Sequence, residues 1–430
     1  MVGNKNFTVM NYQRIKILTA ALLTATTVMT SCSDVKDLDA GMENQDSFTN
    51  NGLPVIDAVY DIQDTAFTTP LTDGVLNQYI RLRGKNLAKA KSININGLEV
   101  DVRSRVYATS SDSYIRIPRM IPEEETGLLV YETDKGKTEI PFNVTIPTLV
   151  LDGLSNEFAL QGSRVKLAGE YFDLYEFGDT TEQSPVSIVI FNDEAGYNEE
   201  VKLDSCTETY ASLTIPVDCP DNSFIRFEWN EKGGERATKT VPYRHTDNLI
   251  FGNFDQDLGA WDGNTTYLTD GTGDDDPQSL GYRFWRFTLT QNAWDYYGIG
   301  WWMQWKENWG DITEHPENYY FVFEVCTAAT CPFYDYGENG TDGAKNGGYN
   351  FSINGGANYQ WDPVYNGLVN TNGKWVTVRI PLDALTDPSK GLPTPGNGGN
   401  LAFICQPNNN DGWDKVDHSF GQFRFEKKVY

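Results

Sequence analysis

The chain has 430 residues, with 60 acidic side chains against 34 basic ones and a formal net charge of −26. This length is enough for two to four domains. The negative charge argues against nucleic acids and acidic polysaccharides as ligands, because their anionic groups would be repelled, and it favours a neutral ligand. Solubility alone is the alternative explanation of the charge.

The first 31 residues have the features of an export signal. Lys5, Arg14 and Lys16 precede an apolar run at residues 17–29, which is roughly half of what a bilayer crossing needs. Residues 29–32 read MTSC and resemble a bacterial lipobox, in which cleavage falls before the cysteine. The resemblance implies that residues 1–31 are removed as a lipoprotein signal peptide and that Cys32 is acylated. An ordinary secretion signal with an incidental cysteine is the alternative.

The residues after Cys32 are polar, and residues 32–53 are predicted to form a flexible tether. Its first residues, SDVKDLD at 33–39, resemble the acidic signal that directs Bacteroidetes lipoproteins to the outer face of the outer membrane, although Val35 and Lys36 interrupt the acidic run. The implied location is the extracellular face of the outer membrane, with the lipid as anchor.

Two segments of similar plan follow, at residues 54–146 and 147–247. Each opens with a proline, and each contains an alternating strand that ends in glycine, at residues 79–84 and 164–169. This repeat predicts tandem β-sandwiches of immunoglobulin-like size. The turns GKNL and GEYF that follow these strands resemble those of IPT/TIG domains. Because neither segment shows clustered aromatic or polar residues, both are predicted to be spacers.

The last segment, residues 248–430, differs in composition, because it contains ten of the eleven tryptophans and most of the Gly/Asn-rich loops. No stretch has helical periodicity. The strand candidates are residues 319–325, 349–353, 374–380, 401–404 and 422–426. This pattern predicts a jelly-roll-type β-sandwich, so the whole chain is predicted to be all-β.

Residues 282–310 hold six tryptophans and form the most aromatic stretch of this segment. Strand geometry sends alternate residues to opposite faces. One face is Tyr297, Ile299, Trp301, Met303 and Trp305, and the other is Tyr296, Gly298, Gly300, Trp302 and Gln304. We interpret the first as a core face. The second would be a flat aromatic platform with an amide at its edge, which suits the apolar face and polar rims of sugar rings.

Tryptophans in predicted loops extend this platform, because exposed tryptophans usually mark a binding surface. By contrast, Trp285, Trp301 and Trp375 stand in alternating strand contexts and are predicted to be core. The predicted glycan-binding residues are Trp261, Tyr296, Trp302, Gln304, Trp305, Trp309 and Trp361. Asn308 and Gln360 are further amides that could contact hydroxyl groups.

Catalytic and metal-binding residues are harder to find. A glycoside hydrolase needs two carboxylates that flank the bond, and the candidates near the aromatic stretch are Asp295, Glu307, Asp311 and Glu314. No cofactor is predicted. Asp255, Asp257 and residues 274–276 are either ligands of a structural calcium or a solvated acidic loop.

The six cysteines show no zinc-binding spacing. Cys326 and Cys331 have a spacing that fits a loop-closing disulfide. Cys206 and Cys219 could form a bridge if their Cα atoms approach to about 6 Å. Cys405 is left as a buried thiol.

Taken together, these features resemble the surface glycan-binding lipoproteins of Bacteroidetes polysaccharide-utilisation systems, in particular the xyloglucan-binding type. The resemblance rests on the lipobox, the proline-marked sandwiches and the start of the last segment, FGNFD at 251–255. It implies non-catalytic binding of a neutral plant polysaccharide, with β-glucans such as xyloglucan or mixed-linkage glucan favoured. It also implies a TonB-dependent transporter and a companion glycan-binding lipoprotein as partners. An extracellular endo-glycanase and a protein-binding adhesin are the alternatives.

Overall fold

The computed structural model describes residues 48–430 except 180, 182–183, 255–266, 293–296, 335–346, 356–358, 388, 390 and 408–411. For residues 297–304, 347 and 405–407 it describes the backbone alone. The described chain consists of strands and a few short helices, which confirms the predicted all-β class. It divides into two compact units, unit 1 (Met1–Thr148 with Lys232–Gly234) and unit 2 (Leu149–Glu231 with Glu235–Tyr430). No helix in the described part of the chain is long and apolar enough to cross a membrane.

Unit 1 contains an N-terminal sandwich. Its strands are β1 (Val55–Asp61), β2 (Asp73–Val75), β3 (Tyr79–Lys85), β4 (Ser92–Ile95), β5 (Leu98–Glu99), β6 (Val106–Ala108), β7 (Asp112–Arg116), β8 (Leu128–Thr133), β9 (Gly136–Pro141) and β10 (Asn143–Thr145). They form the antiparallel sheets β1-β3-β7-β6 and β5-β4-β8-β9, and β2 pairs with β10 in parallel. Burial alternates along β3 and β4, because successive side chains point to opposite faces.

Unit 2 begins with a middle sandwich of the same topology. Its strands are β11 (Val150–Leu154), β12 (Arg164–Glu170), β13 (Ser187–Asn192), β14 (Tyr197–Glu200), β15 (Leu203–Cys206), β16 (Tyr210–Thr214), β17 (Ser223–Asn230) and β18 (Arg236–Tyr243). The sheets are β11-β12-β16-β15 and β14-β13-β17-β18. Apart from the extra pair β2 and β10, the N-terminal sandwich has the same order of strands in its two sheets. The internal repeat in the sequence is therefore also a repeat of strand order.

A glycine at the same place in each repeat explains part of the shared pattern. Gly84 of β3 and Gly169 of β12 both lie beside a register shift in the neighbouring first strand. A Cβ atom at Gly84 would lie 1.8 Å from the carbonyl oxygen of Val55, and one at Gly169 would lie 2.0 Å from that of Val150. Only glycine allows the two strands to approach this closely.

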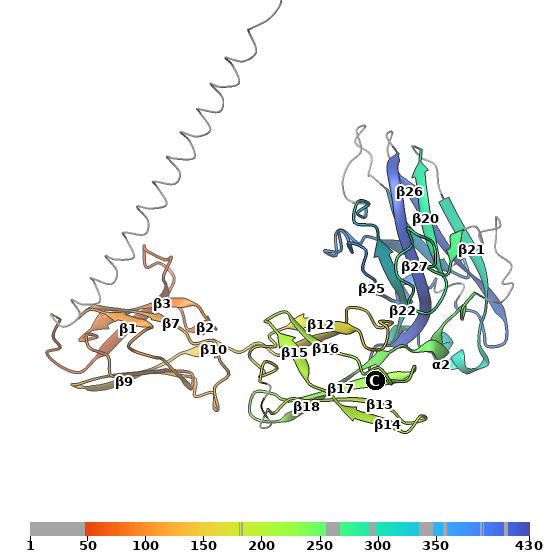
Figure 1. The fold of residues 1–430 in the computed structure, drawn as a ribbon. Helices are drawn as coiled ribbons and strands as arrows, with labels where there is room; N and C mark the ends of the chain where they lie inside the picture. The colour runs from red at the N-terminus through yellow and green to blue at the C-terminus, as the bar shows by residue number, and fades with distance from the viewer. Residues whose placement is uncertain are drawn as a thin grey trace, which may run out of the picture. The chain divides into compact units, whose positions relative to one another are not determined.

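The rest of unit 2 is a C-terminal sandwich of two larger sheets. Its strands are β19 (Leu268–Thr269), β20 (Phe284–Gln291), β21 (Tyr297–Gln304), β22 (Tyr319–Thr327), β23 (Gly347–Ile353), β24 (Tyr359–Trp361), β25 (Val376–Pro381), β26 (Gly398–Pro407) and β27 (Trp413–Lys427). The short helices are η2 (Thr246–Asn248), η4 (Glu307–Trp309), α2 (Gly310–Glu314), η5 (Pro316–Asn318) and η6 (Leu382–Leu385). The sheets are β19-β20-β27-β22-β25 and β21-β26-β23-β24. Figure 1 shows the long strand β27 between β20 and β22.

Aromatic side chains fill the core of the C-terminal sandwich. Phe323 of β22 lies 5.1 Å from Phe351 of β23, and Phe351 lies 4.6 Å from Phe403 of β26, measured between ring centroids. The core prediction for Trp285 and Trp375 is confirmed, because both side chains are buried. Much of the aromatic enrichment of residues 248–430 therefore stabilises the sandwich itself.

The described thiols of Cys206, Cys219, Cys326 and Cys331 are free. The predicted disulfide between Cys326 and Cys331 is therefore not formed. Cys326 lies at the end of β22 and packs with Phe284 against other buried apolar side chains, and this burial raises the pKa of its thiol to about 11. A buried thiol that holds its proton is a poor nucleophile for disulfide exchange.

Candidate functional site

The candidate site is one face of the sheet β21-β26-β23-β24. The strand β21, which carries the aromatic stretch, lies at an edge of this sheet and pairs along its length with β26. Because directly paired positions share a face, the register assigns each position of β21 to one side of the sheet. Ile299 and Trp301 pair with Phe403 and Leu401, which are both buried in the core. These two positions of β21 therefore belong to the core face.

The intervening positions of β21 belong to the outer face. Trp302 pairs with Asn400 and Gly300 pairs with Ala402, and both partners are half-buried rather than buried. The same face continues through Ser352 of β23, which pairs with Ala402. The register thus divides β21 in the way that the alternation of its residues predicts.

The outer face combines small residues, amides and one tryptophan. Its positions are Gly298, Gly300, Trp302 and Gln304 of β21, Gly398, Asn400, Ala402 and Ile404 of β26, Asn350 and Ser352 of β23, and Gln360 of β24. None of these positions is ionisable, although charged residues make up 22% of the chain. A face without charge neither attracts nor repels ions, so it suits a neutral ligand with hydroxyl groups.

Two of the side-chain amides of this face, those of Asn350 and Gln360, are paired on neighbouring strands. Gly298, Ile404, Asn350 and Gln360 form one cross-strand row, which spans all four strands. With neighbouring strands about 4.8 Å apart, this row is about 14 Å wide. The side-chain amide of Gln360 donates to the carbonyl oxygen of Tyr349 at 3.5 Å, which holds it against the sheet. The face is therefore wide enough for several linked sugar rings.

Part of the outer face of the other sheet is covered by the middle sandwich. Glu157, from the loop after β11, accepts hydrogen bonds from Arg379 of β25 at 2.5 Å and from Arg424 of β27. Arg424 also donates to Glu324 of β22 at 3.0 Å. Arg424 and Glu324 are fully buried and Glu157 is 2% exposed. Among the described residues of unit 2, these contacts cover the face at β22, β25 and one end of β27, whereas Thr288 of β20 is exposed.

The pKa values of the two buried carboxylates of this interface are shifted in opposite directions. Burial alone would raise the pKa of Glu157, but the positive charges of Arg379 and Arg424 outweigh it, so the pKa lies below its usual value. Burial raises the pKa of Glu324, and the negative charge of Glu157 adds to that rise against the attraction of Arg424. Glu324 therefore takes up a proton more readily than Glu157 as the pH falls.

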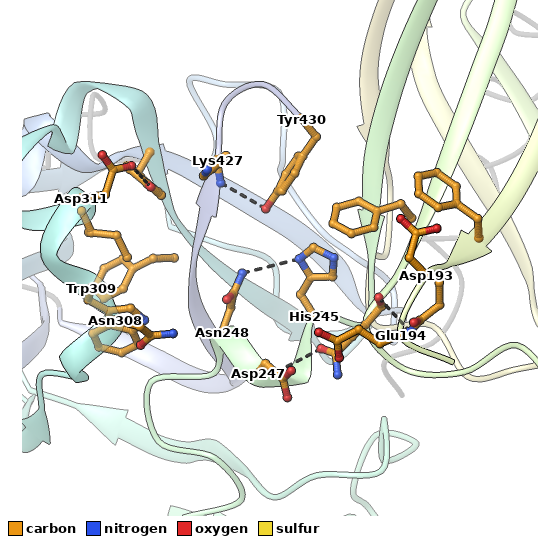
Figure 2. Close-up of a pocket in the computed structure, with 17 residues that line it drawn as sticks. Asp193, Glu194, His245, Asp247, Asn248, Asn308, Trp309, Asp311, Lys427 and Tyr430 are labelled. Atoms are coloured by element: carbon orange, nitrogen blue, oxygen red, sulfur yellow. Dashed lines mark hydrogen bonds between the residues drawn. The ribbon is translucent and has the colours of Figure 1, made fainter. Parts of the chain in front are cut away.

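A cavity of about 600 Å³ lies between the middle and C-terminal sandwiches, within unit 2. Figure 2 shows Asn308, Trp309 and Asp311 on one side, Asp193 and Glu194 on the other, and His245 between them. Its walls come from segments more than 100 residues apart, so sequence spacing could not have predicted it. Its size is in the range of small-molecule sites. Unlike the outer face of β21-β26-β23-β24, it is lined by carboxylates.

Asp311, one of the carboxylates that could serve a hydrolase, is already engaged in this cavity. Its side chain accepts a hydrogen bond from the hydroxyl of Tyr319. Burial, together with this hydrogen bond and the negative charge of Asp311, raises the pKa of Tyr319 above its usual value. This pairing explains the position of Asp311 without a catalytic role.

Three of the predicted platform tryptophans are buried, and the prediction that they are exposed is wrong. Trp305 is 0% exposed, and Trp309 and Trp361 are each 3% exposed. The indole N–H of Trp305 donates to Thr313 at 2.9 Å, and its ring lies 5.1 Å from that of Trp309. A ring packed on both sides has no face left for a sugar. We therefore remove these three residues from the proposed binding surface.

Strand pairing explains the burial of Trp361. The sequence suggests a loop here, but Tyr359–Trp361 is the strand β24, and Trp361 pairs with the buried Tyr349. Its ring lies 5.3 Å from both Phe323 and Phe333 in the core. Because successive residues of a strand face opposite sides of the sheet, the neighbouring Gln360 belongs to the outer face.

The remaining predicted residues lie partly outside the described structure. Trp302 and Gln304 are placed by their backbone in β21, on the outer face, and their side chains are not described. Cys32, Trp261 and Tyr296 lie outside the described residues. Asn350, Ser352 and Asn400 were not among the predicted site residues, although each alternates with buried apolar neighbours.

The candidate calcium ligands give no metal site in the described part of the chain. Asp276 is bound by Arg286 at 2.9 Å, and Asp255 and Asp257 lie outside the described residues. No group of three or more His, Cys, Asp or Glu side chains that could hold a metal occurs among the described residues.

Comparison with known proteins gives one match to a family model. Residues 243–427 match the family described as the surface glycan-binding protein B xyloglucan binding domain. This segment coincides with the C-terminal sandwich and contains the outer face described above. No curated protein matches the chain.

Three solved structures are similar over most of their lengths. The surface glycan-binding protein PbSGBP-B from Prevotella bryantii is 18% identical, with 88% of this chain and 99% of that chain covered and a TM-score of 0.47. The SGBP-B from a complex xyloglucan utilization locus in Bacteroides uniformis is 17% identical, with coverage of 87% and 99% and a TM-score of 0.43. The Bacteroides ovatus mixed-linkage glucan utilization locus SGBP-B, in complex with a mixed-linkage heptasaccharide, is 13% identical, with coverage of 84% and 74% and a TM-score of 0.26.

Proposed function

We propose that this chain, whose residues 243–427 match the model of the surface glycan-binding protein B xyloglucan binding domain, is a non-catalytic cell-surface protein that binds a neutral polysaccharide. The favoured ligands are β-glucans such as xyloglucan or mixed-linkage glucan, and binding would support capture and uptake of the polymer. The observation that carries the proposal is the uncharged outer face of β21-β26-β23-β24, which combines Trp302 with amide side chains.

The chemistry of this face is suited to sugar rings. Trp302, together with Tyr296 earlier in the chain, would stack on the apolar faces of successive rings. Gln304, Asn400 and Gln360 would contact the hydroxyl rims. Hydrogen bonds to neutral hydroxyl groups largely exchange with bonds to water and contribute about 1 kcal/mol each. Most of the affinity must therefore come from the aromatic area that is buried.

Binding without catalysis is supported by the same composition. Hydrolysis of a glycosidic bond needs two carboxylates that flank it. The positions that the four strands contribute to the outer face include no carboxylate, so a polymer lying on it would meet no acid–base pair there.

Location and partners are the further part of the proposal. Acylation of Cys32 would anchor the protein to the extracellular face of the outer membrane. There it would act beside a TonB-dependent transporter and a companion glycan-binding lipoprotein.

Affinity electrophoresis against a panel of neutral and acidic polysaccharides, with a reducing-sugar assay on the same polymers, tests this function. We expect retardation by xyloglucan or mixed-linkage glucan, no retardation by uronic acid polymers, and no release of reducing ends. Release of reducing ends would establish the endo-glycanase alternative. Absence of retardation by every glycan would favour the adhesin alternative.

A further inference from the structure

The N-terminal sandwich, expected to be a featureless spacer, has a distinctive outer surface on the sheet β1-β3-β7-β6. We call it the basic aromatic face, and its residues are Tyr60, Tyr79, Arg81, Arg83, Lys85, Tyr107, Asp112, Tyr114 and Arg116. The alternating residues Ile80, Leu82 and Ile115 are buried on the other side. Asp57 is exposed at the register shift of β1, between the buried Ile56 and Val59, and lies on the same side as the basic aromatic face. Four cations and two carboxylates thus share one face, in a chain whose net charge is −26.

Cross-strand pairing holds the guanidinium groups of this face against aromatic rings. Arg81 pairs with Tyr114, and its guanidinium carbon lies 5.0 Å from the centre of that ring. Arg116 pairs with Tyr79 and lies 5.2 Å from its ring. Stacking of this kind fixes the direction of the arginines and leaves their N–H groups available at the edges.

Most of the positive charge on the face is not neutralised. Asp112 is bound by Arg81 at 2.7 Å, and it lies farther from Arg83, at 3.6 Å. The side chain of Arg83 is 44% exposed. Among the described residues, Lys85 and Arg116 have no carboxylate partner. Arg83 shares Asp112 with Arg81, and its guanidinium carbon lies 4.1 Å from the centre of the Phe67 ring. Lys85 and Arg116 are therefore the cations of this face that are free to bind an anionic group.

Apolar side chains are exposed at the borders of the same sheet. Tyr79 is 49% exposed, Val55 is 43% exposed, and Ile62, directly after β1, is 41% exposed. Tyrosines, arginines and exposed aliphatic side chains on one flat face are typical of a surface that lies at a membrane–water interface. A surface that binds only soluble anions would not need the apolar border.

The predicted tether joins the sandwich beside this face. Asn51 donates a backbone hydrogen bond to Asn86, directly after the strand that carries Lys85. A flexible chain of about 15 residues spans roughly 20 Å. A sandwich attached to an acylated Cys32 in this way would stay close to the lipid surface.

We propose that the basic aromatic face docks on a membrane surface that bears phosphate headgroups. This inference rests on the proposed anchoring at Cys32, and it gives the N-terminal sandwich a second attachment to the membrane. The strongly acidic remainder of the chain does not prevent the contact, because at physiological salt charges are screened beyond about 8 Å. The local charge of the face therefore decides its partner.

Vesicle sedimentation tests the proposal with the mature chain, residues 32–430, carrying Cys32→Ser so that no acyl chain contributes. The vesicles are either phosphatidylcholine alone or phosphatidylcholine with half replaced by phosphatidylglycerol. We expect binding to the anionic vesicles only. The double variant Lys85→Gln/Arg116→Gln should bind them roughly thirtyfold more weakly, since each cation near such a surface contributes about fivefold.

The matched control is Lys135→Gln/Lys137→Gln, which removes the same charge from the β8–β9 hairpin on the other sheet of the sandwich. We expect it to bind anionic vesicles like the parent chain. Equal loss in both variants, equal binding to neutral vesicles, or no binding to either vesicle would overturn the proposal. Binding to polyglutamate without binding to vesicles would also overturn it and would indicate an acidic polypeptide as partner. Glycan affinity, measured in parallel, should be unchanged by either double variant, so failure here is distinct from failure of the proposed function.

Discussion

Trp305, directly after β21, is a fully buried tryptophan. Trp305 is followed by Lys306 and Glu307, and such polar neighbours favour an exposed position. The helices η4 and α2 fold back at this point, however, so Trp305 packs against Trp309 and Phe425. Tertiary contacts decide which side chain is covered by the turn that follows a strand. The local alternation of apolar and polar residues does not reveal these contacts. Trp285 was predictable as core because it lies within a strand of regular alternation.

Truncation of Trp305 should therefore destabilise the protein without a direct effect on binding. Replacing a fully buried indole by Ala removes its contacts and leaves a cavity, so Trp305→Ala should lower the free energy of unfolding by roughly 3–5 kcal/mol. Tyr365, whose side chain is 84% exposed, is the matched control, and Tyr365→Ala should change stability by less than about 0.5 kcal/mol. Urea denaturation followed by fluorescence measures both. Equal stability of Trp305→Ala and the parent chain would contradict the core assignment.

His418 is a buried residue that makes stability depend on pH. Its Nε2 lies 3.0 Å from the carbonyl oxygen of Cys331 and its Nδ1 lies 3.3 Å from the hydroxyl of Tyr349. These contacts fit a neutral imidazole that donates from Nε2 and accepts at Nδ1. Burial lowers its pKa to about 4, against the weaker opposing effect of the two carbonyl groups near Nε2.

The lowered pKa predicts a loss of stability on acidification. Between about pH 6.5 and pH 4 the unfolded chain binds a proton at this position and the folded chain does not, so the folded state loses stability as pH falls. The contribution is fully present above pH 6.5, and the total loss is roughly 3 kcal/mol at pH 4. In chemical denaturation at a series of pH values, the free energy of unfolding should depend less steeply on pH for His418→Gln than for the parent chain. Parallel curves for the two proteins would refute the assignment.

The sequence predicts where strands begin and end better than it predicts which strands pair with each other. The candidate strands at 319–325 and 349–353 correspond to β22 and β23 within two residues at each end. The pairing of β27 with both β20 and β22 brings together segments far apart in the chain, and local patterns cannot reveal it. For the same reason the row of Asn350 and Gln360 on the outer face, and the basic aromatic face of unit 1, emerge only from the paired strands.

The interface built on Glu157 joins the middle and C-terminal sandwiches by buried charges. Removing one member of such a group leaves the others buried and unpaired, so Glu157→Ala should destabilise unit 2 by roughly 3–5 kcal/mol. As a control, Glu228→Ala removes a partly exposed partner of Arg226 and should cost less than about 1 kcal/mol. Guanidinium denaturation compares the two variants with the parent chain. A loss at Glu157 no larger than that at Glu228 would mean that the buried cluster does not hold the interface.

For the whole molecule, the division into units predicts which fragment retains activity. Residues 149–430 keep Glu157 with Arg379 and Arg424, and they should bind glycan with the affinity of the mature chain. A fragment of residues 248–430 would leave Arg424 and Glu324 without Glu157, and it should melt at a lower temperature. Residues 48–148 should bind no glycan. Calorimetric titration and thermal melts of the three fragments test these expectations, and glycan binding by residues 48–148 would contradict the assignment of the site.

Isothermal titration calorimetry of the mature chain and its Trp302→Ala variant, with xyloglucan and mixed-linkage glucan as ligands, tests whether glycan binds on the outer face of β21-β26-β23-β24. Burial of roughly 50–80 Å² on one indole face stabilises the complex by about 1.2–2 kcal/mol. Trp302→Ala should therefore bind with an affinity lower by about tenfold or more and with an unchanged melting temperature, while Tyr365→Ala should bind like the parent chain. Binding by Trp302→Ala equal to that of the parent chain, or a loss of binding that accompanies unfolding, would contradict the placement of the site on this face.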